Sequence, residues 1–155
     1  MKKPADYSLI LAQLEAITDS EQDTIANLAN ASAVLYLNLS DINWAGFYLV
    51  RGDQLVLGPF QGKPACVRID YGRGVCGTAA ATDTTQLVAD VHAFPGHIAC
   101  DGASNSEIVV PVHHHGKLAA VLDIDSPVLN RFHEEDRTGL EACAALLENV
   151  CDWNL

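Results

Sequence analysis

Residues 106–125 read SEIVVPVHHHGKLAAVLDID, and this stretch carries the clearest evidence for the fold. Two mostly apolar runs lie on either side of His115-Gly116, a pair that suits a turn. Runs of this length, rich in valine and isoleucine and bounded by a turn, are typical of paired strands. The stretch therefore predicts an antiparallel hairpin.

The same pattern occurs earlier in the chain. Residues 43–60, NWAGFYLVRGDQLVLGPF, predict a second hairpin around RGDQ, and shorter strands are expected in KPACVRI (63–69) and QLVADV (86–91). The glycine-rich YGRGVCGTA (71–79) indicates a loop that enters a short helix. HAFPGHIACDGASN (92–105) indicates a long loop, and loops of this kind often carry function.

Helices are expected at both ends of the chain. An apolar stripe at helical spacing runs from Tyr7 to Ile17, a second helix follows with Ser20 as its cap, and another begins near His133. Terminal helices around about six strands, joined mostly by hairpins, indicate an α+β fold with an antiparallel sheet. Because no repeat or linker divides the chain, residues 1–155 are expected to form a single domain.

Composition narrows the function classes. The 155 residues carry a formal net charge of −11, so the phosphates of a nucleic acid would be repelled. No apolar run reaches the ~18 residues that a membrane span needs, and the N-terminus lacks the pattern of a signal peptide. We therefore expect a cytoplasmic protein with neither nucleic acid nor membrane as a partner.

The five cysteines fall into two groups. Cys143 and Cys151 share the apolar stripe of the last helix and are expected to lie in the core. The other three, Cys66, Cys76 and Cys100, lie in a short strand, a glycine-rich turn and a loop. Their spacing fits neither a zinc ribbon nor a C-x-x-C motif, although zinc with His97 as fourth ligand stays open. Reversible disulfide chemistry and three structural thiols remain alternatives.

Acidic residues occur where apolar ones are expected. Alternation places Asp123 and Asp125 on one face of their strand, and Glu107 lies among apolar neighbours in the preceding strand. Buried carboxylates are costly unless they bind something, so these could hold an ammonium group and donate a proton. The alternative is a solvated strand end, with Asp125 starting a turn. Trp44 could form an aromatic wall or belong to the core.

Two further patterns carry less information. The tract His113-His114-His115 ends a strand, alternates faces and is interpreted as solvated edge residues. The glycines at 72, 74 and 77 do not match the spacing of a phosphate-binding loop.

Four longer segments resemble the free methionine-R-sulfoxide reductases, which are GAF domain proteins. The segments are NWAGFYL (43–49), LGPFQGKPACVRIDYGRGVCG (57–77), VADVHAFPGHIACDGASNSEIVVP (88–111) and LDIDSP (122–127). The resemblance implies a GAF fold, with a six-stranded antiparallel sheet, helices on one side and an enclosed pocket on the other. By the same resemblance Cys100 matches the catalytic nucleophile, Cys66 the principal resolving cysteine and Cys76 an auxiliary one. The family's substrate-pocket residues correspond to Trp44, Glu107, Asp123 and Asp125.

The resemblance also implies a chemistry that needs no metal or other cofactor. The Cys100 thiolate would attack the sulfoxide sulfur of free methionine-(R)-sulfoxide while Glu107 or Asp125 protonates the departing oxygen. The sulfenic acid on Cys100 would condense with Cys66, and thioredoxin would reduce the disulfide. A homodimer is expected. The alternatives are a non-catalytic GAF module that binds a small ligand and a thiol redox sensor.

Overall fold

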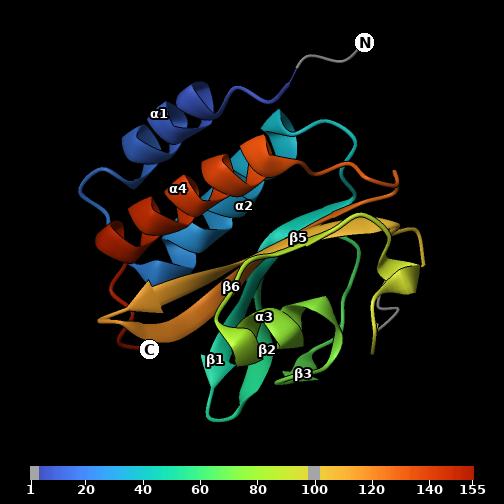
Figure 1. The fold of residues 1–155 in the computed structure, drawn as a ribbon. Helices are drawn as coiled ribbons and strands as arrows, with labels where there is room; N and C mark the ends of the chain where they lie inside the picture. The colour runs from blue at the N-terminus through green and yellow to red at the C-terminus, as the bar shows by residue number, and fades with distance from the viewer. Residues whose placement is uncertain (1–3, 98–101) are drawn as a thin grey trace.

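The computed structural model describes residues 4–97 and 102–155 (Figure 1). The helices are α1 (Tyr7–Thr18), α2 (Thr24–Asn38), α3 (Gly74–Thr82) and α4 (Glu134–Val150), with a 3-10 turn at Val91–Ala93. The strands are β1 (Trp44–Arg51), β2 (Gln54–Gly62), β3 (Arg68–Asp70), β4 (Gln86–Val88), β5 (Ser106–His114) and β6 (Lys117–Ser126). That residues 1–155 form a single domain stays a prediction.

The strands form one antiparallel sheet. Their order is β3-β2-β1-β6-β5-β4, and every neighbouring pair runs antiparallel. The β5–β6 hairpin turns at His115 and Gly116, whose φ values of 51° and 75° lie in the left-handed region. The α+β fold with a six-stranded antiparallel sheet is thus confirmed.

Helices cover the two faces of the sheet unequally. The long helices α2 and α4 pack on one face with α1 outside them, whereas the short α3 lies against the opposite face (Figure 1). Alternation along β6 divides its side chains between these layers. Leu122 and Ile124 join the core beneath the long helices, whereas Val121 joins the cluster beneath α3. Asp123 therefore faces α3.

Four local expectations were wrong in detail. The strand predicted for 86–91 ends at Val88, and Val91 begins the 3-10 turn. Asp23, not Ser20, caps α2, because its carboxylate accepts a 2.9 Å hydrogen bond from the Ala26 amide. The third strand spans Arg68–Asp70 rather than the predicted 63–69, and Pro64 in the predicted range has no N–H to contribute to a ladder. Cys76 lies in the first turn of α3 and not in the loop before it.

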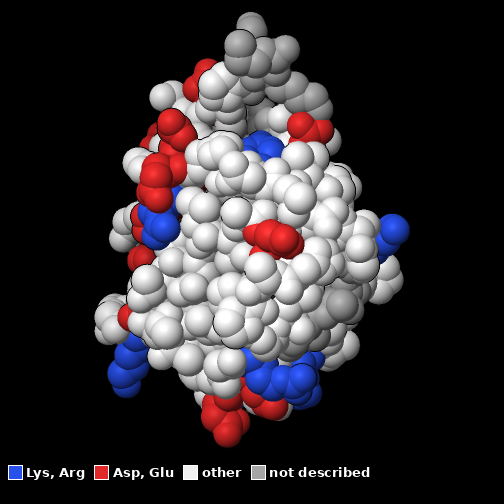
Figure 2. Space-filling view, turned by 45° about the vertical axis from the view of Figure 1, so that its right-hand side comes forward, with Lys and Arg blue, Asp and Glu red and all other residues white. Residues whose placement is uncertain are grey.

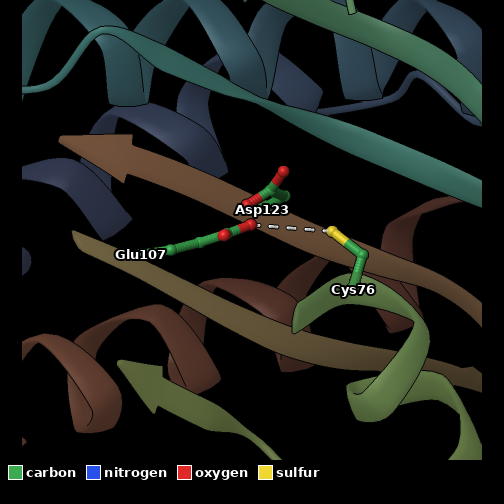
Figure 3. Close-up of side chains that lie close together, drawn as sticks. All are labelled: Cys76, Glu107 and Asp123. Atoms are coloured by element: carbon green, nitrogen blue, oxygen red, sulfur yellow. Dashed lines mark hydrogen bonds between the residues drawn. The ribbon is translucent and has the colours of Figure 1, made fainter. Parts of the chain in front are cut away.

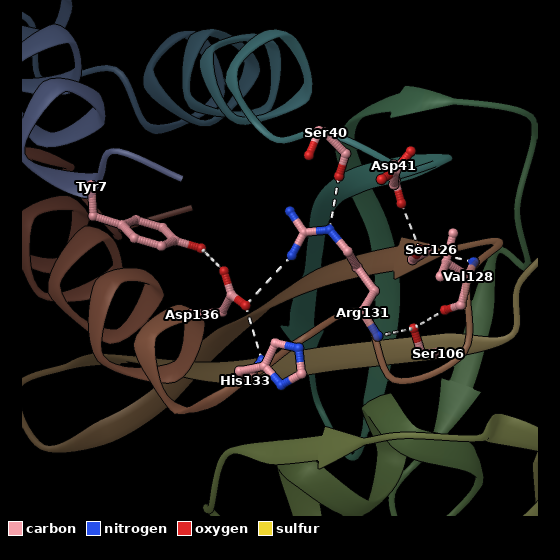
Figure 4. Close-up of polar contacts among 9 residues, drawn as sticks. All are labelled: Tyr7, Ser40, Asp41, Ser106, Ser126, Val128, Arg131, His133 and Asp136. Carbon is pink, nitrogen blue, oxygen red and sulfur yellow. Dashed lines mark hydrogen bonds and ion pairs between the residues drawn. The ribbon is translucent and has the colours of Figure 1, made fainter. Parts of the chain in front are cut away.

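A network of hydrogen bonds and one ion pair connects the elements of the helical layer (Figure 4). Arg131 Nε donates to the Ser40 carbonyl at 2.8 Å, and its guanidinium lies 3.5 Å from the Asp136 carboxylate. That carboxylate also accepts from the Tyr7 hydroxyl at 2.6 Å and from the His133 amide at 2.9 Å. These contacts tie α1, the start of α4 and the connection after α2 together.

Substituting Gly139 by alanine should destabilise the fold. An alanine Cβ there would lie 2.2–2.5 Å from three ring atoms of Tyr7, and the hydrogen bond to Asp136 holds that ring in place. Overpacking of this kind costs ~1–3 kcal/mol, which outweighs the ~1 kcal/mol that alanine gains over glycine in a helix. Chemical denaturation would measure the change. In a Tyr7→Ala background the same substitution should instead stabilise, and a loss there would contradict the steric explanation.

Charge is spread unevenly over the surface. On the face shown in Figure 2, acidic side chains gather along one edge, and much of the middle is uncharged apart from an acidic patch. In residues 4–97 and 102–155, no helix has the length and apolar character needed to cross a membrane.

Candidate active site

The centre of the candidate site is a buried cluster of a thiol and two carboxylates (Figure 3). α3 supplies Cys76, β5 supplies Glu107 and β6 supplies Asp123, and each side chain is at least nine-tenths buried. The Cys76 thiol lies 3.9 Å from Glu107 Oε2, and one ligand atom from each residue falls within 4.8 Å of the others. Residues far apart in the sequence thus meet in one small volume.

Strand register adds Asp125 to the cluster. Asp125 pairs with Glu107 across β5–β6 and with Trp44 across β1–β6. Asp125 is half-buried and lines the same cavity. The structure therefore brings together Trp44, Glu107, Asp123 and Asp125, as the strand alternation and the resemblance led us to expect.

These residues line a cavity of about 60 Å³ between the sheet and α3. Carboxylates form one part of its wall, and the aromatic rings of Trp44 and Tyr48 form another. No side chain within the described ranges caps the N-terminus of α3, which also reaches the cavity through Gly74 and Val75. The positive end of a helix and an acidic wall thus face one space, an arrangement that suits a zwitterion.

Burial changes the protonation of the acidic wall. It is the main cause that raises the pKa of Glu107 well above its usual range, and the nearby charges of Asp123 and Asp125 raise it further. Burial also raises the pKa of Asp123, although the nearby polar groups of Glu107 and Cys76 oppose the change. Three adjacent carboxyl groups cannot all ionise cheaply, so burial and mutual repulsion favour a proton on the cluster.

Cys76 is unsuited to act as the first nucleophile. Burial raises the pKa of its thiol well above the usual value, and the charges of Asp123 and Glu107 add to the effect. A position at a helix N-terminus ordinarily lowers a thiol pKa, but burial and the carboxylates outweigh it here. Cys76 is therefore a protonated thiol in this cavity.

Trp44 belongs to both the core and the cavity wall. Its ring stacks with those of Phe60 and Tyr48, with centroids 5.1 Å and 5.9 Å away, and its indole N–H donates to the Lys63 carbonyl at 3.1 Å. The two sequence interpretations of Trp44 are thus compatible. A ring held by these three contacts presents a rigid apolar surface to the cavity.

Tyr48 is a cavity residue that the sequence reasoning missed. Its hydroxyl donates to the Cys66 carbonyl at 2.9 Å, which links the cavity wall to the segment that carries Cys66. Alternation along β1 places Tyr48 on the same face as Trp44, so the pattern could have identified it. The uncapped start of α3 was also missed, because a nine-residue helix after a glycine-rich loop shows no capping signal.

The cysteines differ in their chemical state. Cys66 is half-buried and disulfide-bonded, whereas Cys76, Cys143 and Cys151 are free thiols. Burial raises the pKa of Cys143 to about 12 and that of Cys151 to about 11, and both lie in the core as expected. Cys100, the expected nucleophile, lies outside the described residues.

The state of Cys66 speaks against the zinc site with His97 that the sequence left open. Because Cys66 is in a disulfide, it is not available to the open zinc alternative with His97. Burial and the nearby His92 lower the pKa of His97, so its imidazole is neutral near pH 7. His113 is not simply a solvated edge residue, because its ring nitrogens lie 2.6 Å from Asp83 and 3.6 Å from Glu148.

Comparison with known proteins agrees with this geometry. The GAF domain family model matches residues 13–150. Protein YtsP of Bacillus subtilis is 61% identical over 96% of this chain and 92% of its own length. The free methionine-R-sulfoxide reductase of Escherichia coli is 55% identical, with 97% and 91% covered. The structure of fRMsr of Staphylococcus aureus in complex with substrate aligns with a TM-score of 0.92 at 49% identity, covering 97% of this chain and 98% of that one. The chain belongs to the free methionine-R-sulfoxide reductases, a family of GAF domain oxidoreductases.

Proposed function

We propose that this protein reduces free methionine-(R)-sulfoxide to methionine. The observation that carries the proposal is the buried pair Glu107 and Asp123 in a cavity beside the disulfide-bonded Cys66. The cavity combines a proton donor, a cation acceptor and redox-active sulfur, which are the groups that sulfoxide reduction requires. The names of the Escherichia coli and Staphylococcus aureus relatives support the same activity.

In the proposed first step, the Cys100 thiolate attacks the sulfoxide sulfur. Glu107 donates a proton to the sulfoxide oxygen as the sulfur–oxygen bond breaks, and its raised pKa is what keeps that proton available near neutral pH. The attack forms a bond between Cys100 and the methionine sulfur, and the protonated oxygen leaves as hydroxide. Hydroxide then bonds to the Cys100 sulfur as the sulfur–sulfur bond breaks, so methionine leaves with the electron pair and its sulfur is reduced, while Cys100 is oxidised to a sulfenic acid.

The cavity orients the substrate through both of its charges. Asp123 Oδ1 is buried and, within the described residues, has no hydrogen-bond partner, so it can accept from the substrate ammonium. Amide N–H groups at the start of α3 and in the loop around Cys100 are the donors for the substrate carboxylate. Trp44 offers its rigid face to the methyl group on sulfur, which favours one epimer.

This arrangement favours the free amino acid over a peptide. In a peptide the ammonium and carboxylate are replaced by amides, which would leave Asp123 unpaired inside the cavity. Leaving a buried polar group without its partner costs ~1–3 kcal/mol, and more when the group is charged.

Recycling is proposed to pass through a disulfide between Cys66 and Cys100. The Cys66 thiol would displace the hydroxyl of the sulfenic acid as water, and a dithiol such as that of thioredoxin would then reduce the bond. Val67 and Tyr71 are exposed close to Cys66 in the chain, so an apolar surface is available for that reductant. The protonated Cys76 fits an auxiliary role, and a reducing compartment such as the cytoplasm fits the cycle. A homodimer remains a prediction.

The test is an assay with separated sulfoxide epimers and a thioredoxin system. We expect steady NADPH oxidation with free methionine-(R)-sulfoxide and almost none with the S epimer or with a peptide that contains methionine sulfoxide. Hydrogen peroxide in place of the sulfoxide should not support turnover. Equal rates with the peptide would contradict the substrate assignment, and turnover with peroxide alone would favour a thiol redox sensor.

A further inference from the structure

The cluster of Cys76, Glu107 and Asp123 also has the composition of a metal site (Figure 3). A thiol and two carboxylates from three separate elements converge with their ligand atoms within 4.8 Å of one another. Thiolate, imidazole and carboxylate are the ligands that Zn²⁺ takes in proteins. No metal is needed for the proposed reduction, but the same ligand set is open to a cation when substrate is absent.

The separations suit a tetrahedral ion. With zinc–sulfur and zinc–oxygen bonds of about 2.3 Å and 2.0 Å, tetrahedral geometry puts a sulfur and an oxygen ligand about 3.5 Å apart. Cys76 Sγ and Glu107 Oε2 already lie 3.9 Å apart. A small side-chain rotation closes the difference. Three protein ligands leave the fourth position to water, as in open zinc sites.

A second observation points to a missing cation. Asp123 is 5% exposed, yet its Oδ1 has no hydrogen-bond partner in the described part of the chain. Neither Asp123 nor Glu107 takes part in an ion pair between described residues. Arg73 lines the cavity but is itself exposed at its rim. The buried carboxylates therefore have no buried counter-charge within these ranges, and a divalent cation would supply one.

We propose that Cys76, Glu107 and Asp123 bind Zn²⁺ in the substrate cavity. The Cys76 thiol releases its proton to solvent on binding, because coordination to zinc deprotonates a thiol. The ion occupies the acidic wall that accepts the substrate ammonium and takes over the carboxylate that donates the proton. Zinc and substrate thus exclude each other, and zinc is a reversible inhibitor of the enzyme.

Metal titration of the disulfide form tests the site directly. In that form Cys66 is not a thiol, which leaves Cys76 as the free cysteine among the described residues that line the cavity. Zn²⁺ affinity is measured by competition with a chromophoric chelator, and Co²⁺ reports a thiolate ligand through its charge-transfer absorption. The matched control is Cys143→Ala, which removes a free buried thiol from the core beneath the long helices.

We expect the wild-type protein and Cys143→Ala to bind one equivalent of Zn²⁺ and to show the cobalt–thiolate band. Cys76→Ala should lose the band and about 100-fold or more in affinity, because loss of a ligand should exceed the 10- to 100-fold typical of outer-shell changes. Asp123→Asn should weaken binding while the band remains. Absence of saturable binding by the wild type, or a full band in Cys76→Ala, would overturn the proposal.

The claim that zinc and substrate exclude each other rests on the proposed function. A competition experiment tests that claim separately from the metal site itself. Free methionine should lower the apparent zinc affinity more than glycine does at equal concentration. Glycine chelates through the same amino and carboxylate groups but has no side chain to fill the cavity. Equal effects of the two would count against the substrate position and leave the metal site standing.

Discussion

Replacing Cys100 by serine should reduce sulfoxide turnover to the uncatalysed background. The proposed reaction needs a sulfur nucleophile that can carry the oxygen as a sulfenic acid, and a hydroxyl group is both a weaker nucleophile and unable to be oxidised in this way. Cys76 is a free thiol in the candidate site that could replace Cys100 as the nucleophile. Burial and the adjacent carboxylates, however, raise the pKa of Cys76 and keep it protonated. It should therefore not rescue the variant.

The measurement is methionine formed per enzyme in a thioredoxin-coupled assay. Cys151→Ser is the matched control, because this buried thiol belongs to the core beneath the long helices and should keep wild-type turnover. Residual turnover by Cys100→Ser above a few per cent of wild type would show that another cysteine performs the attack.

Cys66→Ser should separate the two halves of the cycle. Cys100 can still attack, so one equivalent of methionine should form in a rapid phase before the enzyme stops as a sulfenic acid. A small thiol should restart it, because it can resolve the sulfenic acid directly. Sustained turnover with thioredoxin alone would instead assign resolution to Cys76.

The fold was predictable because the strands alternate. The pattern of residues 106–125 separates Leu122 and Ile124 from Asp123, and the structure places these side chains on opposite faces of β6. Ends of elements were less predictable. Ser20 and Asp23 are both good caps by type, and a backbone φ of 63° at Ser20 decides against the former.

The residues of the site were easier to predict than the contacts between them. Alternation and resemblance both indicate Glu107 and Asp123, yet the approach of Cys76 to Glu107 spans 31 residues and depends on how α3 packs across β5 and β6. Sequence spacing contains no information about that docking. The start of α3 reaches the cavity for the same reason, whereas alternation along β1 could have placed Tyr48 there.

Glu107→Gln should lower kcat about 10²- to 10⁴-fold, the range that general acid catalysis contributes. The amide keeps the shape of the side chain and can still donate a hydrogen bond, but it has no proton to give up to the departing oxygen. KM should change little, since the substrate ammonium binds at Asp123. Asp123→Asn provides the contrast, because it should raise KM more than it lowers kcat.

The pH dependence distinguishes a proton donor from a residue that only shapes the cavity. In the wild type, kcat should fall as pH rises through the raised pKa of the Glu107 cluster, because the donor then loses its proton. Glu107→Gln should lack this alkaline decline. A loss of affinity alone, or an unchanged alkaline limb in the variant, would contradict the role of Glu107 as the acid.

Stability measurements should exclude unfolding as the cause of the lost activity. Burial raises the pKa of Glu107 in the folded state above its value in the unfolded state, so folding takes up a proton. The stability that the protonated Glu107 side chain contributes at low pH is therefore lost as pH rises through the folded pKa. Glutamine does not titrate and escapes this loss. Glu107→Gln should therefore be at least as stable as the wild type in mildly alkaline solution. If the variant is inactive but more stable than the wild type in mildly alkaline solution, the Glu107 carboxyl group contributes to catalysis and lowers the stability of the folded protein.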